Sequence, residues 1–144
     1  FFISRSRPLN AFTFTLPIYI SELALEESFE EQSELAKELP GESVGLIVIG
    51  SEREKHEGII ELLRKNIHPS DAVLTFDPNW IVILAATNEK GIVSILERLP
   101  KILEKEIMGP LDVGAVLYPR DGSDVHRLFK KATTALNPLS TGGH

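Results

Sequence analysis

The chain has 144 residues, of which 42% are hydrophobic and 25% are charged, so it fits one globular domain with a core of its own. It contains no cysteine, which excludes thiol catalysis, disulfide frameworks and cysteine-based zinc sites. The net charge of −6 argues against nucleic acid as a partner, because a general nucleic-acid binder needs a basic face.

Residues 1–20 predict an N-terminal arm or linker outside the domain. Pro17 interrupts the strand-like segment 11–20, which suits an edge strand or an extended arm. The opening FFISRSRPL has no initiator methionine, so we expect a piece of a longer, cytoplasmic protein. No apolar run reaches the roughly 18–20 residues of a membrane helix, so a membrane attachment is expected only through other parts of that protein.

The next segment, residues 21–39, predicts a helix that Pro40 and Gly41 end. Ser21 can cap its start, and a capping box of Ser28 and Glu31 offers a later start as the alternative. Residues 22–42 hold eight Glu and one Lys. This charge pattern favours a solvated helix face, and an acidic docking surface is the alternative.

The rest of the chain alternates apolar runs with helical spacing. The run SVGLIVIG predicts a strand that is buried on both faces. Pro100 is expected to kink or split the helix in which it lies, and Ser123 is expected to cap the last helix. The predicted elements are a strand at 43–50, a helix at 52–67, strands at 72–76 and 80–86, a helix at 91–107, a strand at 112–119, a helix after Ser123 and a disordered tail at 138–144.

The order from Ser43 to Pro119 is β-α-β-β-α-β, which is the ferredoxin-like plan of an α+β fold. It predicts a four-stranded antiparallel sheet with two helices on one face, an extra helix before this unit and another after it, in one domain at 21–137. The right-handed crossover places the hairpin at 77–79 beside the end of the first strand. The expected neighbours at this corner are Gly50, Ser51 and Glu52 on one side and Asp77, Pro78 and Asn79 on the other.

Two segments resemble the GGDEF domains of the diguanylate cyclase family. The segment VGAVLYPRDGSDVHRLFKKATTAL is similar to their end, in which a strand closing in Ala-x-Tyr-Pro precedes Asp-Gly and a helix. HPSDAVLTFDPNWIVILAAT resembles the family's RxxD motif, five further residues and GGDEF, with His68 and Asp71 at the Arg and Asp of RxxD. The signature letters fall on Asp77, Pro78, Asn79, Trp80 and Ile81, and the C-terminal matches are Tyr118, Pro119, Asp121, Gly122, Leu128, Ala132, Ala135 and Leu136. The resemblance covers residues 22–137.

The resemblance implies a site for GTP and Mg²⁺ at the hairpin, which this sequence does not suit. Asp77 and Pro78 replace two glycines that let the backbone approach the nucleotide. The acidic metal ligand is replaced by Asn79, which is a poor ligand for a hard cation. We therefore expect no cyclase activity, no bound metal and no cofactor.

The end of the first strand departs from the family too. Gly50 and Ser51 stand where the family has another metal-binding Asp, and only Glu52 offers a replacement. Two solvated loop acids are favoured for Glu52 and Asp77, and a minimal metal site is the alternative. Trp80 replaces a Glu of the family; packing on the sheet is favoured, and stacking on a base or a partner is the alternative.

The RxxD motif is the family's inhibitory site, where the Arg contacts phosphate or guanine of the bound product and the Asp accepts from guanine N–H groups. His68 cannot form the planar fork of an Arg, whereas Asp71 keeps its capacity to accept. These two residues are the candidate ligand-binding site, with a plain turn as the alternative. His56 and His126 are expected at the surface without acidic partners, and Arg120 is expected to be solvated.

The sequence thus predicts a catalytically inactive GGDEF-like signalling domain that acts as a regulatory, receptor or protein-interaction module of a larger bacterial protein. The expected partners are cyclic di-GMP and a protein partner or a second copy of the chain. The alternatives are a small-molecule-binding regulatory domain of ferredoxin-like plan and an active diguanylate cyclase with an unusual site.

Overall fold

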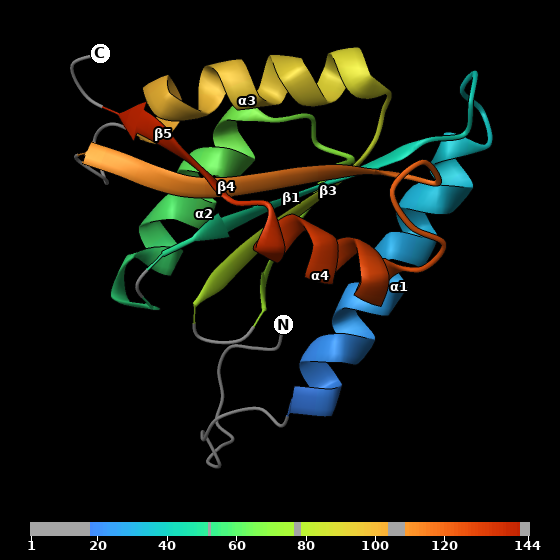
Figure 1. The fold of residues 1–144 in the computed structure, drawn as a ribbon, viewed down its shortest axis with the longest axis horizontal. Helices are drawn as coiled ribbons and strands as arrows, with labels where there is room; N and C mark the ends of the chain where they lie inside the picture. The colour runs from blue at the N-terminus through green and yellow to red at the C-terminus, as the bar shows by residue number, and fades with distance from the viewer. Residues whose placement is uncertain (1–17, 52, 77–78, 104–108, 142–144) are drawn as a thin grey trace.

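The computed structural model describes residues 18–51, 53–76, 79–103 and 109–141. These residues form a five-stranded antiparallel sheet, with strand order β2-β3-β1-β4-β5, and four α-helices (Figure 1). In chain order the elements are α1 (Ile18–Ala36), β1 (Val44–Gly50), a 3₁₀ helix (Arg53–Lys55), α2 (His56–Asn66), β2 (Ala72–Phe76), β3 (Trp80–Ala86), α3 (Glu89–Leu103), β4 (Gly109–Tyr118), α4 (Val125–Thr134) and β5 (Asn137–Thr141).

Strand β1 is the centre of the sheet. Its residues from Val44 to Ile49 are buried, as the continuous apolar run predicts. Val44 lies opposite Ala86 of β3 on one side and opposite Tyr118 of β4 on the other. With β2 on the outer edge of β3, strands β1 to β4 form the predicted ferredoxin-like sheet.

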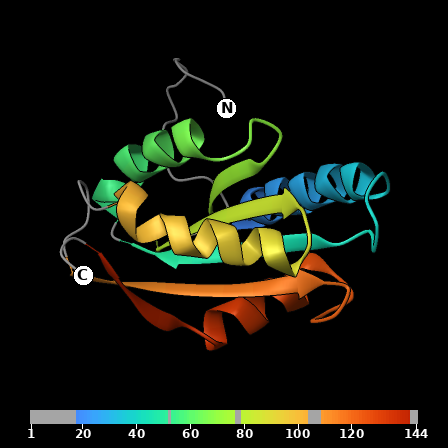
Figure 2. The same ribbon diagram turned by 90° about the horizontal axis from the view of Figure 1, so that it is seen from above.

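Helices cover both faces of this sheet (Figures 1 and 2). On one face, Ile47 and Ile49 pack with residues of α2 and α3, including Ile59 and Leu99. On the other face, the remaining β1 side chains pack with α1 and α4. The two helices outside the ferredoxin-like unit therefore close the second face, which explains why β1 is apolar at every position.

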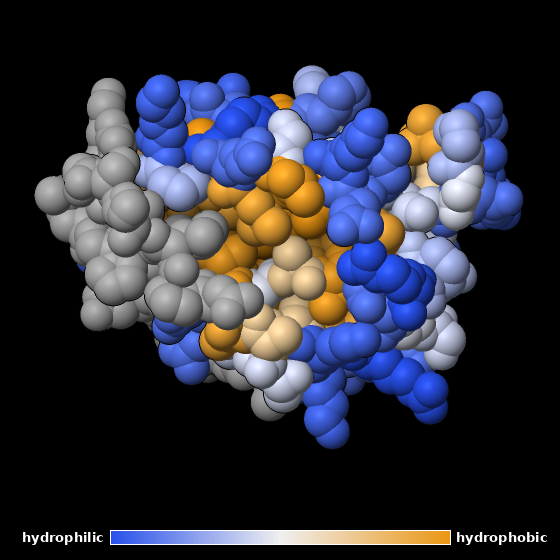
Figure 3. Space-filling model, turned by 45° about the horizontal axis from the view of Figure 1, so that its top comes forward, coloured by the Kyte–Doolittle hydropathy of each residue, from blue (hydrophilic) through white to orange (hydrophobic). Residues whose placement is uncertain are grey.

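On the face that Figure 3 shows, an apolar area lies among hydrophilic side chains. Among the described residues, the large apolar side chains that stay exposed are Leu23, Leu35, Leu39 and Val93. No described helix is both long enough and apolar enough to cross a bilayer.

The fifth strand corrects the prediction for the C-terminal tail. Residues 138–141 were expected to be disordered, but they belong to β5, which pairs with the first half of β4. The proline and glycines of the tail hide this strand in the sequence. An edge strand tolerates Pro138 because only one of its sides takes part in the ladder. Residues 142–144 lie outside the described residues.

Helix α1 also differs from its prediction. Residues 18–20, expected in the arm, are part of α1, and residues 1–17 lie outside the described residues. The helix ends at Ala36, before the expected Leu39, and the chain then turns through Gly41 and Glu42, whose φ angles are 84° and 47°. Glycine adopts this left-handed backbone without strain, which fits the predicted stop at Pro40 and Gly41.

Two further helix predictions are wrong, a split at Pro100 and a cap at Ser123, whereas a kink at Pro100 stays a prediction. Helix α3 continues past Pro100 to Leu103, so the proline does not split it. Helix α4 is capped by Asp124, whose carboxylate accepts from the backbone N–H of Arg127 at 2.9 Å, and not by Ser123. Both residues are good N-caps, and the hydrogen bond to the third residue of the helix decides between them.

Candidate functional site

The hairpin corner predicted from the topology is present. Gly50 lies opposite Trp80, and the backbone N–H of Ser51 donates to the carbonyl of Asn79 at 3.1 Å. Glu52, Asp77 and Pro78, the other predicted members of this corner, lie outside the described residues. The end of β1 and the start of β3 are therefore brought together as expected, at residues far apart in the sequence.

Trp80 packs on the sheet at this corner, which is the favoured interpretation of the sequence. Its ring contacts the ring of Phe129 on α4 edge to face, with centroids 6.1 Å apart. Phe76 contacts the same ring, with centroids 4.6 Å apart. The indole is thus part of the packing beneath α4, while Asn79 is exposed.

Two residues near this corner were misjudged or missed. His56 was expected at the surface but is buried, and its Nε2 lies 3.1 Å from the Ser51 carbonyl. Because a carbonyl only accepts, Nε2 carries the proton, and His56 fastens the end of β1. Asp112 of β4 was missed by the sequence reasoning. It lies next to Gly50, one residue before Val113, which pairs with Ile49 of β1. Among the described residues, no three acidic or histidine side chains form a metal-binding group.

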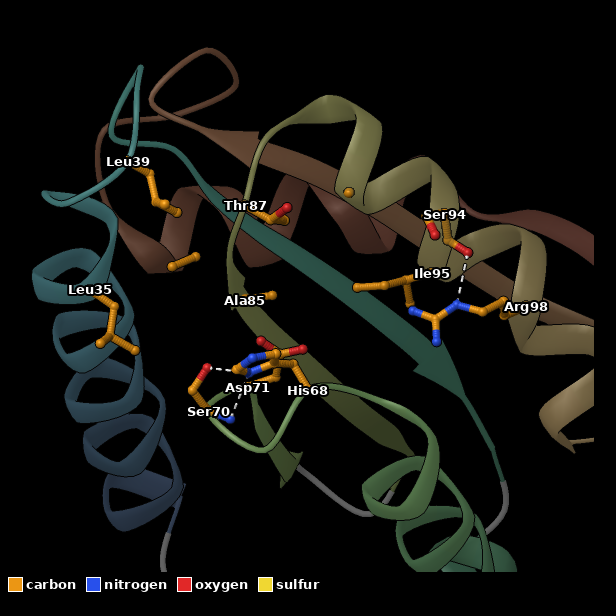
Figure 4. Close-up of a pocket in the computed structure, with 12 residues that line it drawn as sticks. Leu35, Leu39, His68, Ser70, Asp71, Ala85, Thr87, Ser94, Ile95 and Arg98 are labelled. Atoms are coloured by element: carbon orange, nitrogen blue, oxygen red, sulfur yellow. Dashed lines mark hydrogen bonds between the residues drawn. The ribbon is translucent and has the colours of Figure 1, made fainter.

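A second place gathers the other candidate residues. A cavity of about 420 Å³ opens between the end of α1, the turn before β2, the end of β3 and α3 (Figure 4). Leu35, Leu39 and Ile95 give the cavity apolar surface, and the 68–71 turn and Arg98 give it polar surface. The lining residues are Leu35, Leu39, His68, Ser70, Asp71, Ala85, Ala86, Thr87, Gly91, Ser94, Ile95 and Arg98.

The turn that carries His68 and Asp71 is held by its own hydrogen bonds. The Asp71 N–H donates to the His68 carbonyl at 2.9 Å. The backbone N–H of Ser70 donates to His68 Nδ1 at 3.1 Å, and the Ser70 hydroxyl lies 2.7 Å from the same atom. Nδ1 is thus an acceptor, which leaves the proton of the neutral ring on Nε2 as the one donor of His68.

The charged side chains of the cavity are Asp71 and Arg98, and His68 joins them when its ring is protonated. Partial burial raises the pKa of the Asp71 carboxyl, and the nearby charges of His68 and Arg98 and the His68 backbone N–H offset this only in part. Arg98 donates to the backbone carbonyls of Asn66 at 2.9 Å and Ser94 at 3.4 Å. The guanidinium is therefore anchored beside the cavity by neutral groups. Sequence reasoning did not single it out.

Gln32 of α1 was also missed. It is 2% exposed, and both ends of its amide are used: Nε2 donates to the Ser70 carbonyl at 2.8 Å, and Oε1 accepts from the Ala86 N–H at 3.0 Å. The sequence held one clue, because Gln32 lies three residues after Phe29 and four before Ala36, on the buried stripe of an otherwise acidic helix. Gln32 joins the turn and the end of β3, which form two sides of the cavity.

The YP-x-DG segment has a different role. The Asp121 carboxylate accepts from the Leu117 N–H at 2.8 Å and pairs with Arg120 at 3.0 Å and Lys131 at 3.2 Å. The hydrogen bond from Arg120 lowers the pKa of Asp121 most. With the N–H of Leu117 and with Lys131 it outweighs the opposing effect of burial, and the pKa falls to about 2. Arg120, expected to be solvated, is half exposed but also pairs with Glu89 at 3.1 Å.

His126 is exposed as predicted, but it does have an acidic partner. Its Nε2 lies 2.6 Å from a carboxylate oxygen of Glu26, so the pair links α4 to α1. The two residues are 100 positions apart in the chain, and no local spacing reveals the contact.

Comparison with known proteins gives a match at the level of structure. No family model and no curated protein matches the chain. A sensory box/GGDEF family protein from Caulobacter crescentus CB15 superposes with a TM-score of 0.60 and 16% identity, over 78% of this chain and 87% of that one. The GGDEF domain of YfiN (TpbB) from Pseudomonas aeruginosa gives 0.58 and 18%, over 78% and 84%. A microbial GGDEF domain described in its interaction with cyclic di-GMP gives 0.56 and 18%, over 82% of each chain. At such identities the likeness establishes the fold.

Proposed function

We propose that this chain, which has the fold of a GGDEF domain, is a signalling domain that does not synthesise cyclic di-GMP but binds it as a receptor or regulatory module. The observation that carries the proposal is the cavity in which Asp71 and His68 come together with Arg98. This is the turn that the resemblance equates with the family's product-binding site. One of the structures with the same fold is described in its interaction with cyclic di-GMP.

The side chains of the cavity suit a purine nucleotide. Leu35, Leu39 and Ile95 offer apolar surface for the face of a base. Partial burial raises the pKa of the Asp71 carboxyl, and the neighbouring groups offset this only in part. The carboxylate therefore stays available to accept hydrogen bonds from the N–H groups of guanine. Arg98 supplies positive charge for a phosphate. The volume of about 420 Å³ lies within the usual range for small-molecule sites, roughly 300–1,000 Å³.

The hairpin corner supports the loss of synthesis. Asn79 stands where the resemblance requires an acidic metal ligand, and a neutral amide binds Mg²⁺ weakly. Trp80 stands in the place of a Glu, and its ring is engaged with Phe129 on α4. Phosphoryl transfer depends on metal ions that neutralise developing charge, so a corner without these acids is not expected to support it.

Calorimetric titration of the purified chain with cyclic di-GMP tests binding. We expect micromolar affinity for the wild type and a loss of about tenfold or more in Asp71→Asn, because a hydrogen bond to a charged group is at stake. The matched control is Asp112→Asn, an exposed carboxylate beside Gly50 at the hairpin corner. Absence of heat with the wild type at millimolar ligand would overturn the proposed binding. Equal losses in both variants would place the ligand elsewhere.

An assay of product formation from GTP and Mg²⁺ tests the other half of the proposal. We expect no cyclic di-GMP above a protein-free control. Turnover that disappears in Asp112→Asn would contradict the proposal and return the hairpin corner to catalysis.

A further inference from the structure

We infer that Gln32 of α1 is a positioning residue that holds the cavity open. Its amide occupies the place of the next residue pair of the β2–β3 ladder. The packing of α1 against the sheet (the seated helix) and ligand binding are therefore coupled. The inference rests on the proposed function for its ligand, cyclic di-GMP. Its structural part concerns only α1, the 68–71 turn and the end of β3.

The register of β2 and β3 leads to this inference. Ala72 lies opposite Leu84 and Val73 opposite Ile83, and the ladder begins at the first of these pairs. Extending it by two residues on each strand would set Ser70 opposite Ala86. The N–H of Thr87 donates to the Ser43 carbonyl on the β1 side, so the N–H of Ala86, one residue earlier, points to the β2 side. Ser70 and Ala86 would therefore form a hydrogen-bonded pair in a longer ladder.

The amide of Gln32 lies between these two groups. The Ala86 N–H donates to Gln32 Oε1 at 3.0 Å, and Gln32 Nε2 donates to the Ser70 carbonyl at 2.8 Å. A side-chain amide offers an N–H donor and a carbonyl acceptor, as a peptide group does. It therefore satisfies the hydrogen bonds of the Ala86 N–H and the Ser70 carbonyl while keeping the two strands apart. Without it, the Ala86 N–H and the Ser70 carbonyl are complementary to each other.

Closing that step would remove space from the cavity. Ser70, Asp71, Ala85 and Ala86 all line it, with the first two on the turn and the others on β3. Pairing the turn with β3 would bring these two sides together. The open arrangement depends on α1, because Gln32, Leu35 and Leu39 all belong to this helix or the turn that follows it, and Figure 4 shows Leu35 and Leu39 on the far side of the cavity from α3.

Coupling between two sites requires an element with two arrangements that a ligand stabilises to different extents. Here the element is the 68–71 turn, which is either held open by Gln32 or paired with β3. A ligand in the cavity binds only the open arrangement, in which Gln32 is inserted and α1 is seated. Binding must then stabilise the seated helix, and anything that displaces α1 must weaken binding by the same factor.

The experiment compares Gln32→Ala with Glu31→Ala, the exposed neighbour on the same helix, by NMR and calorimetry. In Gln32→Ala we expect a close contact between the α-protons of Asp71 and Ala85, which is the mark of an extended ladder, and continued protection of the Ala86 amide from exchange. Affinity for cyclic di-GMP should fall about tenfold or more. Glu31→Ala should match the wild type in all three measurements.

A loosened structure would give a different result. If Gln32→Ala loses protection at Ala86 without the Asp71–Ala85 contact, Gln32 merely fills a structural position and the inference is wrong. Should that variant not fold, the wild type decides: cyclic di-GMP must slow amide exchange at Ala86 and along α1, and unchanged exchange in the bound state overturns the coupling. If the wild type binds no cyclic di-GMP, the proposed function fails, and the Asp71–Ala85 contact in the variant still decides whether Gln32 holds the ladder open.

Discussion

Two turns of this protein share a pattern and differ in what surrounds their last residue. His68-Pro69-Ser70-Asp71 precedes β2, and Tyr118-Pro119-Arg120-Asp121 begins at the last residue of β4. In the second turn the Asp121 carboxylate accepts from a backbone N–H and pairs with two cations, and its pKa falls to about 2. In the first, burial raises the pKa of Asp71, and its surroundings compensate only in part.

The difference separates a structural carboxylate from one available to a ligand. Asp121 has its hydrogen-bonding needs met within the chain, so it stabilises the fold by closing the edge of β4 at Leu117. Asp71 costs the fold some stability at neutral pH, and it faces a cavity. Perturbed carboxylates in cavities are candidates for function because folding alone gives no benefit from them.

The largest effect is expected from truncating the structural carboxylate. Asp121→Ala leaves the N–H of the buried Leu117 without its acceptor and removes two ion pairs, so the free energy of unfolding should fall by about 2–3 kcal/mol. Asp71→Ala should change it by less than about 0.5 kcal/mol. Urea denaturation at pH 7 measures both, and similar losses in the two variants would erase the distinction between the turns.

The pH dependence of stability should distinguish the turns next. The folded-state pKa of Asp121, about 2, lies below its ordinary value of 3.8, so its contribution is present above pH 3.8 and is lost as the pH falls through about 2. We expect about 2 kcal/mol from this group. Asp121→Asn should remove that part of the acid dependence between pH 5 and about 2. If the free energy of unfolding of the wild type and of Asp121→Asn changes in parallel over this pH range, the Asp121 carboxylate is not specifically stabilised in the fold.

The smallest effect, of opposite sign, belongs to Asp71. Its folded-state pKa is raised, so the ionised carboxyl is penalised in the fold, and stability is lost as the pH rises from the unfolded-state pKa through the folded one. Asp71→Asn should therefore leave stability at pH 7 unchanged or raised by less than about 0.5 kcal/mol. A clear destabilisation, measured by urea denaturation beside Asp112→Asn, would mean that Asp71 serves the fold and not a ligand.

Sequence reasoning reached much of the fold because the strongest signals are local or topological. The apolar run of β1 and the β-α-β-β-α-β order predict the central sheet and the meeting of Ser51 with Asn79. Strand β5 was missed because its pairing is made by the backbone, and its composition is that of a loop. His56 looked polar but lies at helical spacing from Ile59 and Leu63, and this spacing was the overlooked clue.

The site was predicted less completely than the fold. His68 and Asp71 were found because they are close in sequence and resemble a motif. Gln32 and Arg98 act through contacts that span tens of residues, such as 38 from Gln32 to Ser70 and 32 from Arg98 to Asn66. Such partners become visible only when the fold brings α1 and α3 to the same turn.

An NMR titration of the amide signals with cyclic di-GMP decides whether the cavity binds this ligand. We expect shifts concentrated at Ser70, Asp71, Thr87, Gly91 and Arg98, with the signals of Ser51, Asn79 and Trp80 unmoved. Shifts centred on the hairpin corner, or no shifts at saturating ligand, would contradict this expectation.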